Sequence, residues 1–420
     1  MILEPNPSRR TVVRRAAPLV QVLIGNGIFM FSQWCVLILL VRYRGSADAG
    51  EYVLATTLFT PVFMCAGMKL RQAYVSDAAG TFSAATYRRL RLLATAAAVT
   101  TCIGLAIAWP ASGSFWPLAV VIFADAGEAQ SDFHYAVMQR AGNFKAFSRS
   151  LGFRGVLGVV IAGALLWLGA SQLVALSAWA CSWWFSWFAI DRRFRPDEWG
   201  MTDIREVARL ARILLPLGVS TFAVSLATSV PRLAVARYEG IATLGVFGSI
   251  YMLFTAGLFA LEASSDVLLR PLAAAHARGD RSVLRRSLVR GVQLGIATMA
   301  AGLALTVLGA DRLLSLIYGA SFGQFDSVLS VLTAALGLQV VTMVARTAVL
   351  ASGAFGTRLK AEAAALLMVV ASSALLVPWL GLVGAAWATV VLAASQCAGS
   401  LTLIHRAASD GGPSSETLSS

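Results

Sequence analysis

Long apolar runs alternate with short polar segments along the whole chain. Runs of about 20 apolar residues recur in both halves, and most charged residues stand between them. About 30 Å of hydrocarbon requires about that many residues at the rise of an α-helix, so each run predicts a membrane-spanning helix. Few segments have the strict alternation of a membrane β-barrel strand. We therefore expect an all-α polytopic integral membrane protein.

The apolar runs predict about twelve transmembrane helices. In the first half they cover residues 17–41, 52–74, 90–109, 115–137, 151–169 and 174–190. In the second half they cover residues 213–235, 244–269, 288–308, 328–350, 361–380 and 382–404. Little more than Gly381 separates the last two runs, which predicts a tight turn there.

A polar, charged linker over residues 191–212 divides these spans into two six-helix lobes, residues 17–190 and 213–404. Residues 1–16 form a basic N-terminal segment. Residues 405–420 are polar and rich in serine and glycine, so we expect a disordered tail.

One short pattern occurs twice. Arg42-Tyr43-Arg44-Gly45 and the following Gly50-Glu51-Tyr52 match Arg237-Tyr238-Glu239-Gly240 and Gly245-Val246-Phe247 at a constant offset of 195 residues. A shared offset across several identities indicates a duplicated half. In membrane proteins such repeats are typical of transporters whose path lies between the halves, so we expect the two lobes to surround a central cavity.

The basic residues predict the orientation in the membrane. Of the 34 lysines and arginines, 28 fall in the N-terminal segment, in the connections after the second, fourth, sixth, eighth and tenth spans, and in the tail. Five fall in the opposite connections, and Arg346 lies inside a span. Positive charge concentrates on the cytoplasmic side, so both termini are predicted to be cytoplasmic.

Composition excludes several other classes of protein. The chain is 58% hydrophobic and 13% charged, and its net charge of +13 is spread between the apolar runs and not gathered in a patch for nucleic acid. All five cysteines fall inside apolar runs without metal-ligand spacing, and no phosphate-binding GxxxxGK motif occurs. We therefore expect no nucleic acid partner, no metal, no cofactor and no ATP hydrolysis.

The fourth predicted span carries carboxylates on one face. Asp125, Glu128 and Asp132 stand at i, i+3 and i+7, and Asp125 falls near the middle of the membrane. Ionisable groups at that depth mark ion or substrate paths, so we interpret the cluster as a site for a coupling ion or a contact to sugar hydroxyls. A structural ion pair with an arginine of a neighbouring helix is the alternative. Glu262 in the eighth span is a further candidate for ion coupling.

Several arginines and amides are candidates for contacting a polar cargo. Guanidinium groups suit bidentate recognition of phosphate. The candidates flank the repeated turn, lie near the inner ends of the second and tenth spans, or share one face of the first span: Arg44, Arg232, Arg237, Arg71, Arg346, Asn26 and Gln33. Charge pairing at helix ends, contact with lipid head groups and snorkelling are the alternatives for the arginines.

The sixth predicted span carries four tryptophans. We expect them to face lipid or to act as anchors at the membrane interface: Trp179, Trp183, Trp184 and Trp187.

The repeated motif and several turn motifs resemble those of a known family. Leu39-Leu40-Val41-Arg42-Tyr43 with Gly50-Glu51-Tyr52 is similar to the first-loop pattern of bacterial polysaccharide transporters of the O-antigen type. These oligosaccharide-lipid flippases are related to MATE multidrug exporters. The second half agrees in its turn motifs, which are Pro216-Leu217-Gly218, Pro231-Arg232, Arg270-Pro271-Leu272, Ile317-Tyr318-Gly319 and Gly381-Leu382-Val383-Gly384-Ala385-Ala386.

The resemblance implies a function. It implies a transporter, not an enzyme, that moves a polyprenyl-pyrophosphate-linked oligosaccharide across the bacterial inner membrane by alternating access driven by an ion gradient. Membrane lipids, a glycan polymerase and export machinery are the implied partners. A MATE-type drug or cation antiporter is the first alternative, and a membrane-embedded glycan polymerase or glycosyltransferase is the second. A membrane scaffold would have little use for intramembrane carboxylates.

Overall fold

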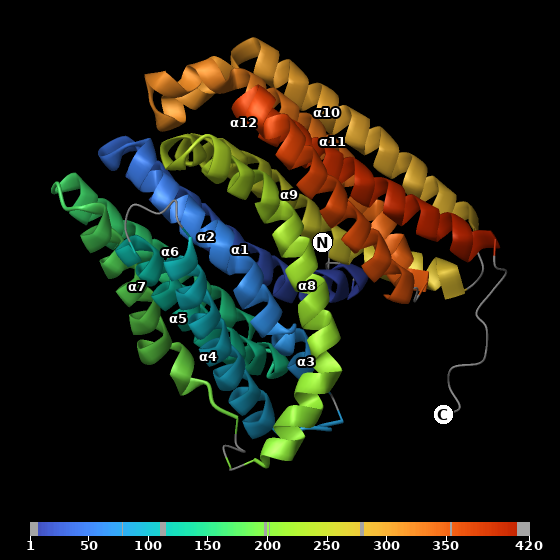
Figure 1. The fold of residues 1–420 in the computed structure, drawn as a ribbon. Coiled ribbons are helices and arrows are strands. Elements are labelled where there is room, and N and C mark those ends of the chain that lie inside the picture. The colour runs from blue at the N-terminus through green and yellow to red at the C-terminus, as the bar shows by residue number, and fades with distance from the viewer. Residues whose placement is uncertain are drawn as a thin grey trace, which may run out of the picture. The chain divides into compact units, whose positions relative to one another are not determined.

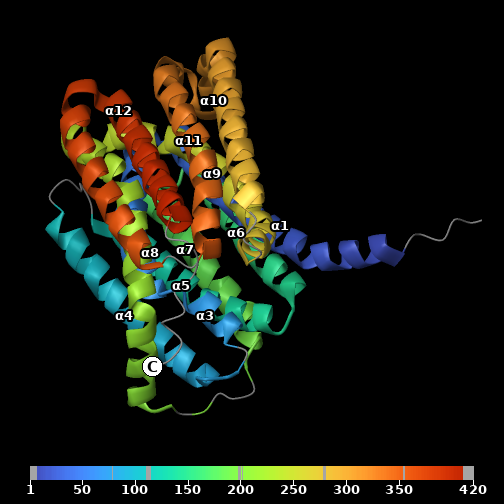
Figure 2. The same ribbon diagram turned by 90° about the vertical axis from the view of Figure 1, so that its right-hand side faces the viewer.

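A computed structural model describes the backbone of residues 7–77, 79–109, 115–196, 200, 202–277, 281–352 and 355–409 (Figures 1 and 2). Side chains are described for these residues except 7–19, 260–285, 288, 305, 307, 348–359 and 403–409. Helices occupy nearly all of the described backbone, and no strand occurs in that part of the chain. The predicted all-α fold is confirmed.

The chain divides into two compact units, residues 1–222 and 223–420. The first unit contains α1 (Pro7–Arg44), α2 (Ser46–Gly67), α3 (Leu70–Ser76), α4 (Ala84–Ala108), α5 (Phe115–Arg140), α6 (Phe144–Trp167), α7 (Gln172–Ala189) and the 3-10 turn η1 (Asp191–Arg193). The division falls inside α8 (Ile204–Tyr238), which begins within the predicted linker. Helix α1 begins inside the segment predicted as a polar lead.

The second unit contains the rest of α8, α9 (Ile241–Ala277), α10 (Arg281–Tyr318), η2 (Ala320–Phe325), α11 (Asp326–Ser352) and α12 (Phe355–Ser409). Helix α12 covers both of the last two predicted spans. Gly381, with φ 56° and ψ −130°, breaks it into two arms, one for each span. The predicted turn at Gly381 is therefore confirmed.

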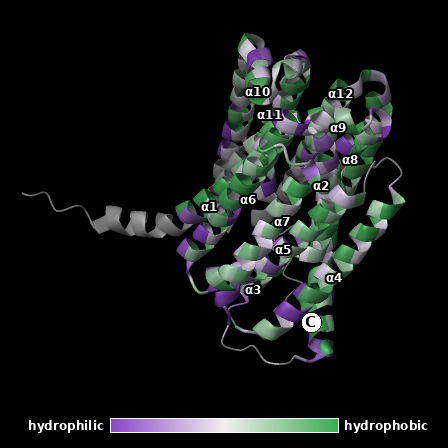
Figure 3. Ribbon diagram, turned by 90° about the vertical axis from the view of Figure 1, so that its left-hand side faces the viewer, coloured by the Kyte–Doolittle hydropathy of each residue, from purple (hydrophilic) through white to green (hydrophobic). Residues whose placement is uncertain are grey.

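The described residues contain nine helices that are long and apolar enough to cross a membrane. A tenth candidate is a bent pair in α10, 289–304 and 308–318, whose arms meet at 73°. Helix α5 is as long as its neighbours but carries the three carboxylates, and α12 supplies two arms. Counting these gives the expected twelve spans. Hydrophobic residues extend along most of the helices in Figure 3.

The spans of the first unit form a closed ring. Helix α1 packs against α6, α6 against α7, α7 against α5, α5 against α4, α4 against α2, and α2 against α1. Helix α3 continues the line of α2 and packs against α5. This order surrounds α5 with α2, α3, α4, α6 and α7, so its charged face can meet groups from several helices.

The two copies of the repeated turn have the same backbone geometry. Gly45 and Gly240 have φ of 91° and 90°. The Gly45 amide donates to the Leu40 carbonyl at 3.1 Å, and the Gly240 amide donates to the Val235 carbonyl at 3.2 Å, again at the offset of 195 residues. Each turn joins two long helices, α1 to α2 and α8 to α9. The duplication expected from the sequence is thus visible in local structure.

The second predicted span is interrupted between α2 and α3. Met68 and Lys69 adopt left-handed backbone conformations, with φ of 43° and 50°. Helix α8 packs on this break through Gly218, where an added methyl group would lie 2.6 Å from the Cys65 carbonyl oxygen. The Thr221 hydroxyl lies 3.1 Å from the Met64 carbonyl oxygen and 2.9 Å from the Gly218 carbonyl oxygen of its own helix, and it shares its proton between them. Since a broken helix leaves carbonyls without helical partners, this contact stabilises the break.

Two of the four tryptophans in α7 depart from the prediction. Trp179 and Trp183 are buried, not lipid-facing, and their rings pack against Tyr52 and Phe29 at centroid distances of 5.8 and 5.4 Å. The prediction was wrong for this pair because α7 lies between α5 and α6, so one of its faces is internal.

We expect Gly45→Ala and Gly240→Ala each to destabilise the protein by about 1–2 kcal/mol, because both residues need a left-handed backbone. No atom lies within 4 Å of an added methyl group at either position, so the loss reflects backbone strain alone. Gly104→Ala is the matched control, since Gly104 also has open space but lies inside α4. Thermal unfolding of the purified protein in detergent measures the effect. Equal melting temperatures for all three variants would contradict it.

Candidate functional site

The carboxylates of α5 are held inside the first unit. Asp125, Glu128 and Asp132 are all half-buried, and their spacing places them on the face that meets neighbouring helices. A carboxylate within a membrane-spanning bundle needs compensating charge or hydrogen bonds. The three residues satisfy this requirement to different degrees.

Asp132 bridges two arginines from different helices. Arg71 of α3 lies 3.4 Å from one carboxylate oxygen, and Arg91 of α4 forms an ion pair with the other. The buried Arg91 also donates from Nε to the Ala129 carbonyl at 2.7 Å. The sequence assigned Arg71 to cargo and Asp132 to ion coupling, whereas the structure joins them. Asp132 therefore has the arginine partners that the structural alternative expects.

Arg154 of α6 is a wholly buried cation beside this cluster. Its side chain is 0% exposed, and its Nη2 donates to the Tyr135 hydroxyl at 2.8 Å. The guanidinium also faces the rings of Phe29 and Trp183, at 5.1 and 5.0 Å from their centroids. Its Nε and Nη1 are buried without a hydrogen-bond acceptor. A buried guanidinium with unused donors is costly unless a nearby anion compensates its charge.

Two carboxylates interact electrostatically with Arg154, namely Glu128 of α5 and the buried Asp191 of η1. Glu128 also interacts with Arg71 and Arg91. Among the described residues, neither Glu128 nor Asp125 forms an ion pair with a basic side chain at contact distance. These two carboxylates therefore differ from Asp132, whose oxygens are both engaged.

One candidate amide of α1 reaches the same region. Gln33 accepts a hydrogen bond from the Tyr52 hydroxyl at 3.2 Å, and its Nε2 is buried without an acceptor. Tyr52 in turn interacts electrostatically with Asp125 and Glu128. The other amide, Asn26, donates to the Val22 carbonyl one turn earlier at 2.8 Å. The structure thus brings Gln33 toward the carboxylates and leaves Asn26 bonded within its own helix.

The arginines at the repeated turn make local contacts. Arg44 pairs with Asp48 at 3.2 Å across one helical turn, and Arg237 is exposed. Arg232 stacks over Tyr251, with 4.8 Å from its guanidinium carbon to the ring centroid, and its Nε is buried without an acceptor. Arg44 therefore matches the helix-end alternative. The side chain of Glu262 lies outside the described residues.

The second unit contains its own polar chain. Arg346 of α11 forms an ion pair with the buried Glu362 of α12 instead of snorkelling. Gln396 donates to Glu362 at 3.4 Å and accepts from Gln339 at 3.1 Å. The chain links α11 to both arms of α12, since Glu362 precedes Gly381 and Gln396 follows it.

Sequence reasoning missed most of the partners in these clusters. Arg91 and Arg154 stand at the edges of predicted spans and were counted as loop charges of the cytoplasmic side. Arg91 is the second residue of the predicted run 90–109, and Arg154 is the fourth residue of the run 151–169. These positions inside the runs were the available signal that the two arginines belong to spans and not to loops. Glu362 stands just inside the run 361–380 and carried the same signal.

Comparison with known proteins connects this fold to membrane transporters. The capsular polysaccharide biosynthesis protein CapF of Staphylococcus aureus is 24% identical over 372 residues, which cover 86% of this chain and 92% of CapF. The lipid II flippase MurJ in an inward closed conformation matches with a TM-score of 0.75 at 12% identity, over 92% of this chain and 87% of MurJ. An inward-facing MATE multidrug transporter of the MOP superfamily matches with a TM-score of 0.68 at 16% identity, over 95% and 98% of the two chains.

No family model matches the chain. The structural similarities nonetheless cover nearly the whole molecule, so this chain has the fold of the MurJ and MATE transporters. The resemblance expected from the repeated turn is confirmed at the level of fold.

Asp132→Asn and Asp125→Asn make the same chemical change on one helix and should have different effects. Loss of the Asp132 charge removes the ion pair of the buried Arg91, so we expect about 2–3 kcal/mol of destabilisation. Asp125 forms no such pair with the described residues, so Asp125→Asn should leave stability unchanged or raise it. Thermal unfolding in detergent compares them, and an equal loss in both variants would contradict this assignment.

Removing one member of the Arg346–Glu362 pair should cost about 3 kcal/mol, because the other charge stays in a low-dielectric interior. Arg346→Met tests this loss. The double variant Arg346→Met with Glu362→Met should recover most of it, because no unpaired charge remains. A double variant less stable than the single variant would show that the pair is not the source of the effect.

Proposed function

We propose that the protein translocates a polyprenyl-pyrophosphate-linked oligosaccharide, or a related polysaccharide precursor, across the bacterial inner membrane by alternating access. The observation that carries the proposal is the charged cluster within the spans of the first unit, where Arg71, Arg91 and Arg154 surround Asp132 and Glu128. A purely structural bundle would gain little from that many intramembrane charges.

The chemistry of the cargo explains why such a cluster is useful. A sugar head group and its pyrophosphate would lose their hydrogen bonds in hydrocarbon, so they cannot cross the membrane unaided. Guanidinium groups can replace that solvation and bind phosphate through paired hydrogen bonds. The name of CapF, which refers to capsular polysaccharide biosynthesis, supports a glycan precursor as cargo.

Asp125 and Glu128 are the coupling-ion residues in this proposal. Both lie in a membrane-spanning helix, and within the described part of the chain they lack the close ion pairs that engage Asp132. A proton or sodium ion could therefore bind them and change the net charge of the cluster. Glu262 is a further candidate for ion coupling, and Arg232, Arg237 and Arg346 are the second unit's candidates for contacting the cargo.

The proposal includes an orientation and partners. The excess of basic residues on one set of connections supports cytoplasmic termini. A glycan polymerase and export machinery would then receive the cargo on the outer face. The protein itself performs no covalent chemistry in this proposal.

A MATE-type antiporter for drugs or cations is the second candidate. The observation that favours it is the presence of Asp125 and Glu128 on a fold shared with a MATE multidrug transporter. Carboxylates suit a cationic cargo, whereas the surrounding arginines suit an anionic one. Binding of lipid-linked oligosaccharide compared with organic cations separates the two candidates.

Deletion of the gene should cause lipid-linked oligosaccharide to accumulate on the cytoplasmic side, and the wild-type gene should restore glycan export. We expect Asp125→Asn with Glu128→Gln to abolish complementation and its dependence on external pH, while protein levels in the membrane stay normal. Asp48→Asn, which removes a half-buried carboxylate beside the first copy of the repeated turn, is the control. Full export at every pH by the double variant would contradict ion coupling, and export by the deletion strain would contradict the cargo.

A further inference from the structure

Four polar side chains link Arg154 of α6 to Asp191 at the start of η1, and we call them the Arg154–Asp191 network. Arg154 Nη2 donates to the Tyr135 hydroxyl at 2.8 Å, and the Ser150 hydroxyl donates to the Asp191 carboxylate. The hydroxyl oxygens of Tyr135 and Ser150 lie 3.4 Å apart. Since Ser150 has one hydroxyl proton and Asp191 accepts it, Tyr135 is the donor in that contact. The network therefore runs in one direction, from a cation through two hydroxyls to an anion.

All four members of this network are buried. Tyr135 is the most exposed of them at 2%, and the others are at 0%. Glu128 is only half-buried, and it stands two turns before Tyr135 on the same face of α5. Glu128 is therefore the part of this arrangement that an ion can reach, and the network lies sealed behind it.

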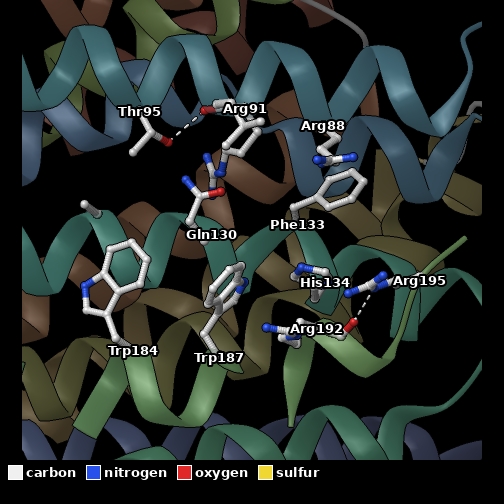
Figure 4. A pocket seen from close by; sticks show the side chains of 12 residues that line it. Arg88, Arg91, Thr95, Gln130, Phe133, His134, Trp184, Trp187, Arg192 and Arg195 are labelled. Carbon is white, nitrogen blue, oxygen red and sulfur yellow. Dashed lines mark hydrogen bonds between the residues drawn. The ribbon is translucent and has the colours of Figure 1, made fainter. Parts of the chain in front are cut away.

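Helix α5 separates the network from a pocket of about 480 Å³ in the same unit. Gln130 and Phe133 of α5 line that pocket, as Figure 4 shows, and no member of the network does. At about 100° of rotation per residue, Glu128 and Tyr135 lie on the opposite side of the helix from this pair. The pocket therefore does not hydrate the network, and a change of charge at Glu128 has to be compensated by protein groups.

Arg154 is shared between two carboxylates and forms a contact ion pair with neither. Glu128 and Asp191 both interact with it electrostatically. Its Nη2 leads to Asp191 through the two hydroxyls, whereas its Nε and Nη1 have no hydrogen-bond acceptor. These unused donors are free to serve Glu128. One buried cation thus has an anion at the accessible site and a second anion in the interior.

We propose that Arg154 alternates between Glu128 and Asp191 as the coupling cation leaves and enters. When Glu128 is ionised, Nε and Nη1 of Arg154 turn toward it. When Glu128 is neutralised, Asp191 compensates Arg154 through Tyr135 and Ser150. Without this second anion, each uptake of a cation would leave a buried guanidinium uncompensated. The proposal rests on the assignment of Glu128 to ion coupling, and it makes Arg154 and Asp191 positioning residues for that site.

Other charged or titratable groups also face these carboxylates. Glu128 meets five further groups from α2, α3, α4 and its own helix: Tyr52, Arg71, Arg91, Asp125 and Asp132. Asp191 faces the charge of Arg154 and three hydroxyls: Ser131, Tyr135 and Ser150. The five groups around Glu128 are unchanged in the variants below, so a difference between those variants reports on the Arg154–Asp191 network.

Dicyclohexylcarbodiimide, which modifies protonated carboxyl groups in apolar surroundings, measures the charge of Glu128 directly. Purified full-length protein in detergent is labelled across a pH series, and peptide mass spectrometry gives the fraction modified at Glu128. Asp191→Asn should move half-maximal labelling to lower pH by about one unit, because Arg154 then serves Glu128 alone and favours its ionised form. Arg154→Gln should move it to higher pH, because the ionised form loses its cation. Asp203→Asn, the same change at an exposed carboxylate just before α8, is the matched control and should keep the wild-type midpoint.

The double variant Arg154→Gln with Asp191→Asn tests the route of the effect. Since Asp191 acts through Arg154, the second substitution should not change the midpoint of Arg154→Gln. Ser150→Ala removes no charge and should shift the midpoint in the same direction as Asp191→Asn, so it decides the matter if the charge variants misfold. The proposal is overturned by an unchanged midpoint in Asp191→Asn, or in Ser150→Ala where Asp191→Asn does not fold. A downward shift by Asp191→Asn that persists without Arg154 overturns it as well.

The labelling needs no cargo, so it separates this proposal from the proposed function. The expected midpoints in a protein that moves no lipid-linked oligosaccharide would contradict the cargo and support the alternation of Arg154. Transport by a protein whose midpoint does not respond to Asp191→Asn would support the cargo and overturn the alternation.

Discussion

The compensation of charge inside a membrane-spanning bundle is the constraint on which the rest of this structure depends. An ionised carboxylate or guanidinium in a low-dielectric interior is unstable unless opposite charge or hydrogen bonds surround it. Asp132 meets this condition by drawing Arg71 and Arg91 from two helices. Those contacts tie α3 and α4 to α5, so a polar requirement helps to determine which spans are neighbours.

One of these charge pairs lies beside the break in the second span. Arg71 belongs to α3, and α3 begins only after the left-handed pair Met68 and Lys69. Arg71 pairs with Asp132 of α5 directly after this break. Helix α8 covers the exposed backbone through Gly218 and Thr221. A strained backbone, its cover and the charge pair thus form one arrangement, of the kind that concentrates at functional sites.

The sequence predicted much of the fold because its signals are local. Runs of apolar residues located the spans, Gly381 located a tight turn, and the repeated Arg-Tyr motif located two turns with matching hydrogen bonds. It also placed three carboxylates on one face of α5. It did not predict their partners, because Arg91 precedes Asp132 by 41 residues and periodicity carries no information on which helices meet. The Arg346–Glu362–Gln396 chain and the burial of Trp179 escaped prediction for the same reason.

Transport of a glycan-bearing lipid is the central claim, and reconstitution measures it directly. Purified protein would be placed in liposomes with a lipid-linked oligosaccharide whose sugar is accessible to a membrane-impermeant glycosidase only on the outer leaflet. In protein-free liposomes about half of the lipid should resist the enzyme, because the uncharged bilayer interior bars the polar head group. We expect the protein to make the resistant fraction fall toward zero, faster with an ion gradient than without one. A resistant fraction equal to that of protein-free liposomes, under every gradient, would contradict the account.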